Sequence, residues 1–204
     1  MSSRISGMCT KEKEDIVICI NSKTSYGRQR FTLAHELYHV LYEEGMQRVI
    51  CDMSMNSDKS ESVREADQFA SYLLMPYDAL LEYEHDKEKW SLEKIIDAEQ
   101  FFQVSHQAML HRLVCDNLLS DSIADKYKNL TVSTVAARLG YGKELYFSTE
   151  EKKQFFTTGE YIRKVERIAE KDLISEGRRE ELLLEAYRAD IVYNYDEEEA
   201  NLND

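Results

Sequence analysis

Apolar residues recur every three or four positions through most of the chain, and this spacing predicts a mainly helical protein. The clearest amphipathic stretch runs from residue 30 to residue 41. Its apolar positions, which fall on one side of a helix, are Leu33, Ala34, Leu37, Val40 and Leu41. Thr32 comes directly before them and is a candidate N-cap. We therefore expect a helix with one buried side at this point.

A second amphipathic helix is expected over residues 61–75, because the apolar positions again repeat at helical spacing and Pro76 follows them. Its buried stripe consists of Val63, Ala66, Ala70, Leu73 and Leu74, with Phe69 at the margin. Between the two helices, residues 42–60 are polar and end in an Asn-Ser-Asp-Lys-Ser run, which is the composition of a loop.

One stretch stands out as a β-strand. Residues 15–21 form an apolar, β-branched run that is closed by Asn21. Residues 4–8 before it, and residues 25–27 after it, have the composition of turns. The strand either packs on the helix that follows or offers an edge on which an extended peptide pairs.

Residues 91–102 and 106–114 predict two helices joined by a short break, which is a helix-turn-helix pattern. One interpretation is a surface that docks nucleic acid or a repressor through His106, Gln107 and Arg112. The other is a structural helix pair, and the small number of Lys and Arg residues here favours it.

The rest of the chain also favours helices. Apolar residues over 131–139 form a helical stripe, and Gly140 supplies a helix stop. Residues 145–147 suggest a short extended piece. Residues 150–193 alternate charged and apolar positions, which predicts amphipathic helices, and an acidic block follows.

Composition narrows the class of protein. The chain has 204 residues, of which 32% are charged and 43% hydrophobic, with one proline and seven glycines. No apolar run is long enough to span a bilayer, and no secretory leader opens the chain. The four cysteines have neither paired nor metal-finger spacing, so we expect reduced thiols in a cytoplasmic protein. The net charge of −13 argues against autonomous nucleic-acid binding.

The first helix carries the candidate chemistry. His35 and His39 are four residues apart, so both imidazoles leave the same helix face. Two neutral imidazoles in this arrangement can hold one tetrahedral zinc ion at roughly 2.0–2.1 Å. Glu36 is displaced by about 100° around the helix, where a carboxylate can reach a water on the metal and act as a general base. The alternative is a pair of incidental histidines, and the apolar helix around them favours the metal site.

At this point the sequence resembles a known family. The segment RQRFTLAHELYHVLY followed by READQFASYLLMP resembles the ImmA/IrrE family of zinc metallopeptidases, which are small, cytosolic, gluzincin-like enzymes often encoded beside phage or mobile-element repressors. The resemblance implies an α+β, mainly helical fold with a short sheet packed on the H-E-x-x-H helix. Compared with family members, this chain starts close to the strand, so a packing element is expected to be missing or supplied by a partner.

On this interpretation the chain has four parts. A metallopeptidase domain covers residues 1–90 and a helix-turn-helix-like region covers residues 91–145. A C-terminal helical region follows over residues 146–195, and residues 196–204 are an acidic tail.

The resemblance also implies roles for single residues. His35 and His39 would be the zinc ligands and Glu36 the catalytic base. The third ligand of the family is usually a Glu three residues before the Ala of the second motif, but this chain has Val63 there.

Three acidic residues are candidates for the missing third ligand. Asp67 comes first, because it shares the helix face of Val63 and an acidic residue on an apolar face needs a partner. In related enzymes, however, this position orients a ligand histidine. Glu65 is the second choice, although it lies about 200° around the helix from Val63. Glu61 precedes the helix proper and is the third.

Three functions follow from these interpretations. The first is a zinc-dependent endopeptidase that cleaves a helix-turn-helix repressor encoded by a mobile element or prophage. The second is a catalytically degenerate peptidase fold that binds a repressor or a toxin–antitoxin partner without cleaving it. The third is a transcription factor that uses the helix-turn-helix segment. The net negative charge makes it the least favoured of the three hypotheses. The sequence gives no membrane partner.

Overall fold

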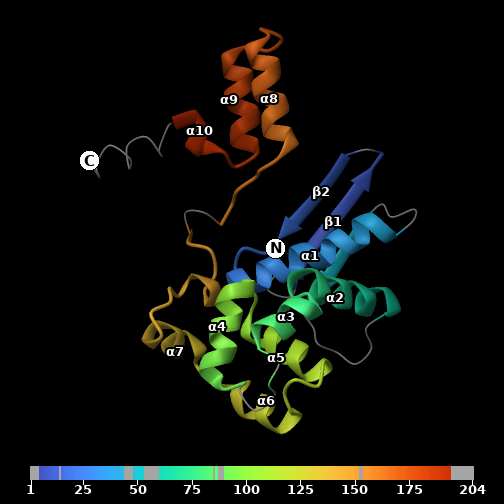
Figure 1. Ribbon diagram of the computed structural model, residues 1–204. Helices are drawn as coiled ribbons and strands as arrows, with labels where there is room; N and C mark the ends of the chain where they lie inside the picture. The colour runs from blue at the N-terminus through green and yellow to red at the C-terminus, as the bar shows by residue number, and fades with distance from the viewer. Residues whose placement is uncertain are drawn as a thin grey trace. The chain divides into compact units, whose positions relative to one another are not determined.

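The computed structural model describes residues 5–13, 15–43, 60–84, 86, 90–151 and 154–193, together with the backbone of residues 48–52. The chain forms two compact units, residues 1–149 and residues 150–204, and each is described by itself (Figure 1). The first unit has the α+β, mainly helical fold that was predicted. Residues 1–90 and 91–145 thus lie in one compact unit, and the four-part division drawn from the sequence stays a prediction.

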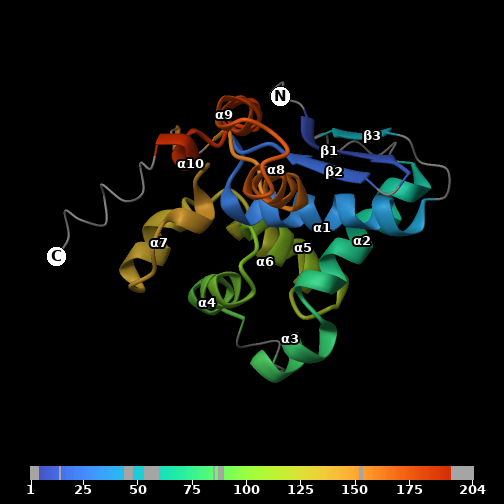
Figure 2. The same ribbon diagram turned by 90° about the horizontal axis from the view of Figure 1, so that it is seen from above.

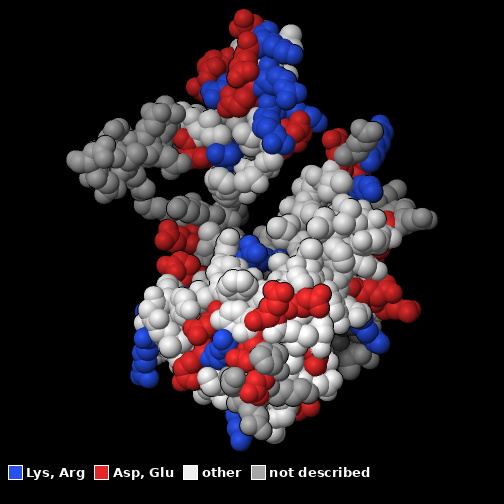
Figure 3. All heavy atoms as spheres, viewed as in Figure 1, with Lys and Arg blue, Asp and Glu red and all other residues white. Residues whose placement is uncertain are grey.

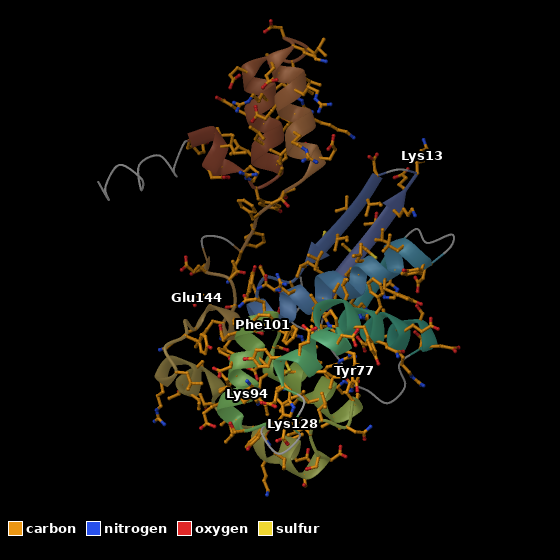
Figure 4. All side chains as sticks on the ribbon, in the orientation of Figure 1. Lys13, Tyr77, Lys94, Phe101, Lys128 and Glu144 are labelled. Atoms are coloured by element: carbon orange, nitrogen blue, oxygen red, sulfur yellow. The ribbon has the colours of Figure 1, made fainter. Side chains whose placement is uncertain are left out.

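The sheet of the first unit has three antiparallel strands in the order β2-β1-β3. They are β1 (Ile5–Glu12), β2 (Asp15–Ile20) and β3 (Arg48–Asp52). The β1–β2 turn includes Lys13, which has a φ of +54° (Figure 4). The strand predicted at residues 15–21 is confirmed as β2.

Two sequence-based predictions about the sheet are wrong. A turn was expected over residues 4–8, but residues 5–8 belong to β1, and the expected loop over residues 42–60 contains β3. β1 is the central strand and is paired on both sides. Its extended backbone is therefore supported by hydrogen bonds to a neighbour on each side rather than by a β-branched sequence.

The first two helices are α1 (Tyr26–Tyr42) and α2 (Glu61–Leu74). The helix predicted over residues 30–41 is confirmed, but it starts earlier, with Ser25 at the N-cap position, so the N-cap assigned to Thr32 is wrong. Gly27 lies in this early first turn. A Cβ at this glycine would lie 2.6 Å from the backbone nitrogen of Ser105, so only glycine lets the first turn of α1 approach that backbone.

Six further helices complete the described part of the first unit. They are α3 (Tyr77–Tyr83), α4 (Leu92–Phe102), α5 (His106–Cys115), α6 (Asp121–Tyr127), α7 (Val132–Arg138) and the short 3-10 helix η2 (Glu144–Tyr146). Of these, α3, α4, α5 and α6 contribute to the main apolar core of the unit. The core includes Met75, Leu80, Trp90, Ile95, Val104, Met109 and Leu113. Residues 145–147 were expected to be extended, but they begin within η2.

The α4–α5 pair does not present the surface that a helix-turn-helix reader would need. Arg112 is only 2% exposed, and its guanidinium lies 3.7 Å from the centroid of the Tyr72 ring. His106 is 7% exposed, and its Nδ1 lies 2.5 Å from Oε1 of the fully buried Glu99. Of the three residues named for docking, only Gln107 is exposed. The interpretation that Arg112 and His106 contact nucleic acid is therefore wrong, because both are used inside the fold.

The second unit consists of α8 (Glu160–Glu170), α9 (Glu176–Glu185) and α10 (Ala189–Tyr193) around a small core of Ile162, Val165, Leu183 and Ala186. Figure 3 shows that Lys and Arg gather over α8, where Arg163, Lys164 and Arg167 are exposed. The acidic tail over residues 196–204 lies outside the described residues. Among the helices described in both units, none has the length and apolar character needed to cross a bilayer.

Candidate metal centre

α1 lies between two layers of the first unit. The sheet covers one side of this helix and α2 runs along another (Figure 2). Consecutive residues of α1 therefore face different surroundings. His35 contacts α2 through Asp67, and Glu36 points toward β1, where Gly7 lies.

The two histidines meet through their Nε2 atoms. Nε2 of His39 lies 3.1 Å from Nε2 of His35, and the ring centroids are 4.9 Å apart. Both residues are buried, with 6% of His35 and 1% of His39 exposed. Two nitrogens that bind one tetrahedral zinc ion at about 2.05 Å would lie about 3.3 Å apart. The spacing of the two Nε2 atoms is therefore close to that of a shared metal ion.

Each imidazole has a carboxylate beside its other ring nitrogen. Oδ1 of Asp67 lies 2.9 Å from Nδ1 of His35, within a hydrogen bond. Oε1 of Glu43 lies 2.9 Å from Nδ1 of His39, close enough for an ion pair but poorly aligned for a hydrogen bond. A carboxylate at Nδ1 favours the tautomer that carries its proton there.

This tautomer has a direct consequence for the pair. With a proton on each Nδ1, both Nε2 atoms present lone pairs toward each other at 3.1 Å. Two facing lone pairs repel unless a cation lies between them. A proton or a metal ion satisfies this condition, and imidazole nitrogen is a common zinc ligand.

Glu43 was not singled out in the sequence, although its spacing of four residues from His39 would have allowed it. The hydroxyl of Ser62 in α2 donates a hydrogen bond to Oε1 of Glu43. Burial would raise the pKa of this carboxyl, but the bond from Ser62 and the contact with His39 lower it. Glu43 is therefore held as an anion beside the second imidazole.

Glu36 is fully buried, and neither of its carboxylate oxygens has a hydrogen-bond partner among the described residues. Leaving a buried carboxylate without a donor is costly. The arrangement is therefore suited to a ligand that is not part of the chain, such as a water molecule that donates to the carboxylate. This is the position in which a general base would receive a proton.

The three acidic residues predicted as candidates for the third ligand are all described by the structure. Asp67 contacts the ring nitrogen of His35 that does not face His39, and Glu65 accepts a hydrogen bond of 2.6 Å from the hydroxyl of Tyr38. That bond raises the pKa of Tyr38 to about 12. Glu61 is exposed in the first turn of α2. In the part of the chain that the structure describes, no three His, Cys, Asp or Glu side chains are grouped to hold a metal ion.

The donor set thus fits a divalent metal ion through His35 and His39. The predicted roles of Asp67, Glu65 and Glu61 as third ligand are not tested by this geometry and stay predictions. The structure adds Glu43 to the residues around the site and places Asp67 where it orients an imidazole.

Comparison with known proteins gives an independent result. Residues 2–114 match the model of the peptidase family M78, described as the IrrE N-terminal-like domain. No curated protein matches the chain. The family match covers more than half of the 204 residues and includes β1, α1 and α2. It confirms the resemblance noted from the two sequence motifs, and the chain belongs to the M78 peptidase family through its IrrE N-terminal-like domain.

Proposed function

We propose that this protein is a zinc-dependent endopeptidase whose centre is formed by His35, Glu36 and His39. The observation that carries the proposal is the convergence of two buried Nε2 atoms at 3.1 Å beside a buried carboxylate that has no described partner. A peptidase needs both features together, because the imidazoles hold the metal and the carboxylate moves the proton. Membership of a peptidase family supports the same reaction class.

In this proposal each residue of the centre has a separate role. His35 and His39 would hold zinc, which when bound supplies the Lewis acidity that polarises a scissile carbonyl and acidifies a water molecule. Glu36 takes the proton of the attacking water and delivers it to the leaving amine. Asp67 and Glu43 keep the two rings in the tautomer that leaves both Nε2 atoms free for the metal. Gly7 leaves room for the Glu36 carboxylate against β1.

The substrate is an extended protein segment in this proposal. β2 is an edge strand that pairs with β1 on one side. Its residues Ile16 and Val17 are 47% and 54% exposed. An extended peptide can add to such an edge through main-chain hydrogen bonds. By resemblance to the family, the substrate is a cytoplasmic helix-turn-helix repressor encoded by a mobile element or prophage.

Cleavage of such a repressor is the direct test. Purified full-length protein with measured zinc content is incubated with the helix-turn-helix protein encoded nearest to its gene, and cleavage is followed by mass spectrometry. The expected result is cleavage at one or a few bonds that is abolished by chelation and by Glu36→Gln. Stoichiometric zinc without cleavage of any candidate repressor would overturn the substrate assignment. Absence of zinc binding would overturn the enzyme.

A second candidate is a peptidase fold that binds a repressor or a toxin–antitoxin partner without cleaving it. One observation favours it, namely that the described residues supply two metal ligands and not three. Partner capture that is unchanged by Glu36→Gln and by chelation would support this function. If the partner is instead cleaved by the wild type, and this cleavage is lost both in Glu36→Gln and after chelation, the enzyme is supported.

A further inference from the structure

We propose that Val63 makes the metal at this centre exchangeable, so that zinc occupancy follows the free metal concentration. This inference rests on the proposed function, because it concerns the same two imidazoles. The proposed function assigns the metal ligands and the base, whereas this inference assigns the residue that sets the affinity of the centre for zinc.

The packing of α2 on α1 gives Val63 its place. The two helices run antiparallel, because Asp67 contacts His35 near the middle of α1 while Ser62 contacts Glu43 at its end. His39 lies between these two contacts along α1, and position 63 lies between them along α2. Val63 is one turn before Asp67 and shares its helix face. The half-buried valine therefore lies opposite the turn of α1 that carries His39.

The neighbouring carboxylates are already engaged. Asp67 is bonded to His35, Glu65 accepts from Tyr38, and Glu43 lies between Ser62 and His39. Recruiting any of them as a ligand would break one of these contacts. Val63 has no donor atom, so the face of α2 that looks onto the imidazole pair adds no ligand at this position.

A centre with two protein ligands holds its metal less firmly than one with three, because structural and catalytic zinc sites in proteins use three or four. Adding one carboxylate at position 63 should therefore tighten binding. Changes to groups that only orient a ligand already alter metal affinity by about 10–100-fold, so a new ligand should have an effect of at least that order.

The experiment compares Val63→Glu with Val63→Gln in the full-length protein. Zinc affinity is measured by competition with a chromophoric chelator, with zinc ion as the only added ligand. We expect Val63→Glu to bind zinc at least about tenfold more tightly than wild type, and Val63→Gln to stay within about threefold. Cobalt absorption provides a second measurement, because a third protein ligand changes the intensity of the visible bands. Circular dichroism verifies that both variants are folded.

The outcomes separate the two proposals. If wild type already binds zinc as tightly as Val63→Glu, with the same cobalt spectrum, the inference about Val63 is overturned while the peptidase proposal stands. If neither protein binds zinc but both are folded, the metal centre itself is overturned. Tightening by Val63→Gln equal to that by Val63→Glu would also overturn the inference, because the glutamine cannot supply the charged ligand.

Discussion

Gly7 of β1 lies directly against the carboxylate of Glu36 in α1. A Cβ at position 7 would be 2.6 Å from Oε1 of Glu36 and 2.5 Å from Cγ2 of Thr32. Both distances are shorter than real Cβ contacts, so any side chain at position 7 must displace one of these groups. The strand and the H-E-x-x-H helix are therefore fitted to each other at the residue that would act as base.

Gly7→Ala should displace Glu36 and destabilise the first unit. Overpacking in a well-packed interior usually costs about 1–3 kcal/mol, and we expect a loss of that size in urea unfolding. Catalytic activity should fall more than zinc content, because the atoms nearest to the added Cβ belong to Thr32 and Glu36 and not to the imidazoles. Gly177→Ala is the matched control, since a Cβ there meets nothing within 4 Å. Unchanged stability and activity in Gly7→Ala would contradict this packing.

Asp67→Ala should weaken zinc binding about 10–100-fold, because the carboxylate at Nδ1 of His35 orients the ring. Glu65→Ala should change it much less, because Glu65 is bonded to Tyr38 and not to an imidazole. Metal content and chelator competition measure both variants side by side. The reverse order would make Glu65 a metal ligand.

Acidification should release the metal. His35 and His39 bind zinc only in the neutral form, so protons compete with the metal for Nε2. Zinc content measured after gel filtration at a series of pH values should fall as the solution becomes acidic. Zinc retained in full down to pH 4 would show that the two histidines are not ligands.

A separate buried pair makes stability depend on pH. Nδ1 of His106 lies 2.5 Å from Oε1 of Glu99, and its Nε2 lies 3.1 Å from the carbonyl oxygen of Tyr127, so both nitrogens face acceptors. Burial would lower the pKa of His106, but the bond and charge of Glu99 raise it above the ordinary 6.5. Burial raises the pKa of Glu99, and the hydroxyl of Tyr146 donates to its Oε2.

The sign of the effect follows from proton binding. Between pH 6.5 and the raised pKa of the folded state, His106 in the folded protein keeps a proton that the unfolded state has lost. The contribution to stability is thus fully present below pH 6.5 and is lost as the pH rises through the folded pKa. The raised pKa of Glu99 also makes the free energy of unfolding fall as the pH rises, but over a lower pH range that begins at the ordinary pKa of a glutamate. Urea unfolding at pH 6 and pH 8 should show this loss in wild type.

Two variants test the pair. The double variant Glu99→Gln/His106→Gln should show a smaller difference between pH 6 and pH 8 than wild type. Glu99→Ala alone should cost about 3–5 kcal/mol, because it leaves His106 buried without its partner. An equal pH dependence in wild type and the double variant would show that other groups are responsible.

The sequence predicted the parts of this fold that local periodicity controls. The amphipathic spacing around residue 35 and around residue 67 was sufficient to identify α1 and α2, and the β-branched run identified β2. β1 was missed because its residues have no strong strand preference, and β3 because its short Val-Ile run lies in a polar stretch and pairs with a strand far away in the sequence. The start of α1 was missed because Ser25, Tyr26 and Gly27 have the composition of a turn, whereas the first turn of α1 packs against the distant backbone of Ser105.

The residues of the candidate site that lie on one helix were predictable from the sequence, but their contacts with α2 were not. His35, Glu36 and His39 were found because a fixed spacing on one helix requires them to lie together. Asp67 was found by its place on an apolar face, but which ring nitrogen it contacts depends on the packing of α2 on α1. Glu43 was missed because an acidic residue at a helix end is usually solvated, whereas here it lies beside His39 and accepts a hydrogen bond from Ser62 in α2.

Because α1 contacts α2 through its histidines and β1 through its glutamate, only fragments that contain both neighbours can form the metal centre. Its histidines depend on a helix that begins at residue 61, while its glutamate depends on a strand that begins at residue 5. A peptide limited to residues 26–42 would contain the whole H-E-x-x-H sequence and still lack both supports. Recombinant fragments for assay should therefore retain both flanking elements.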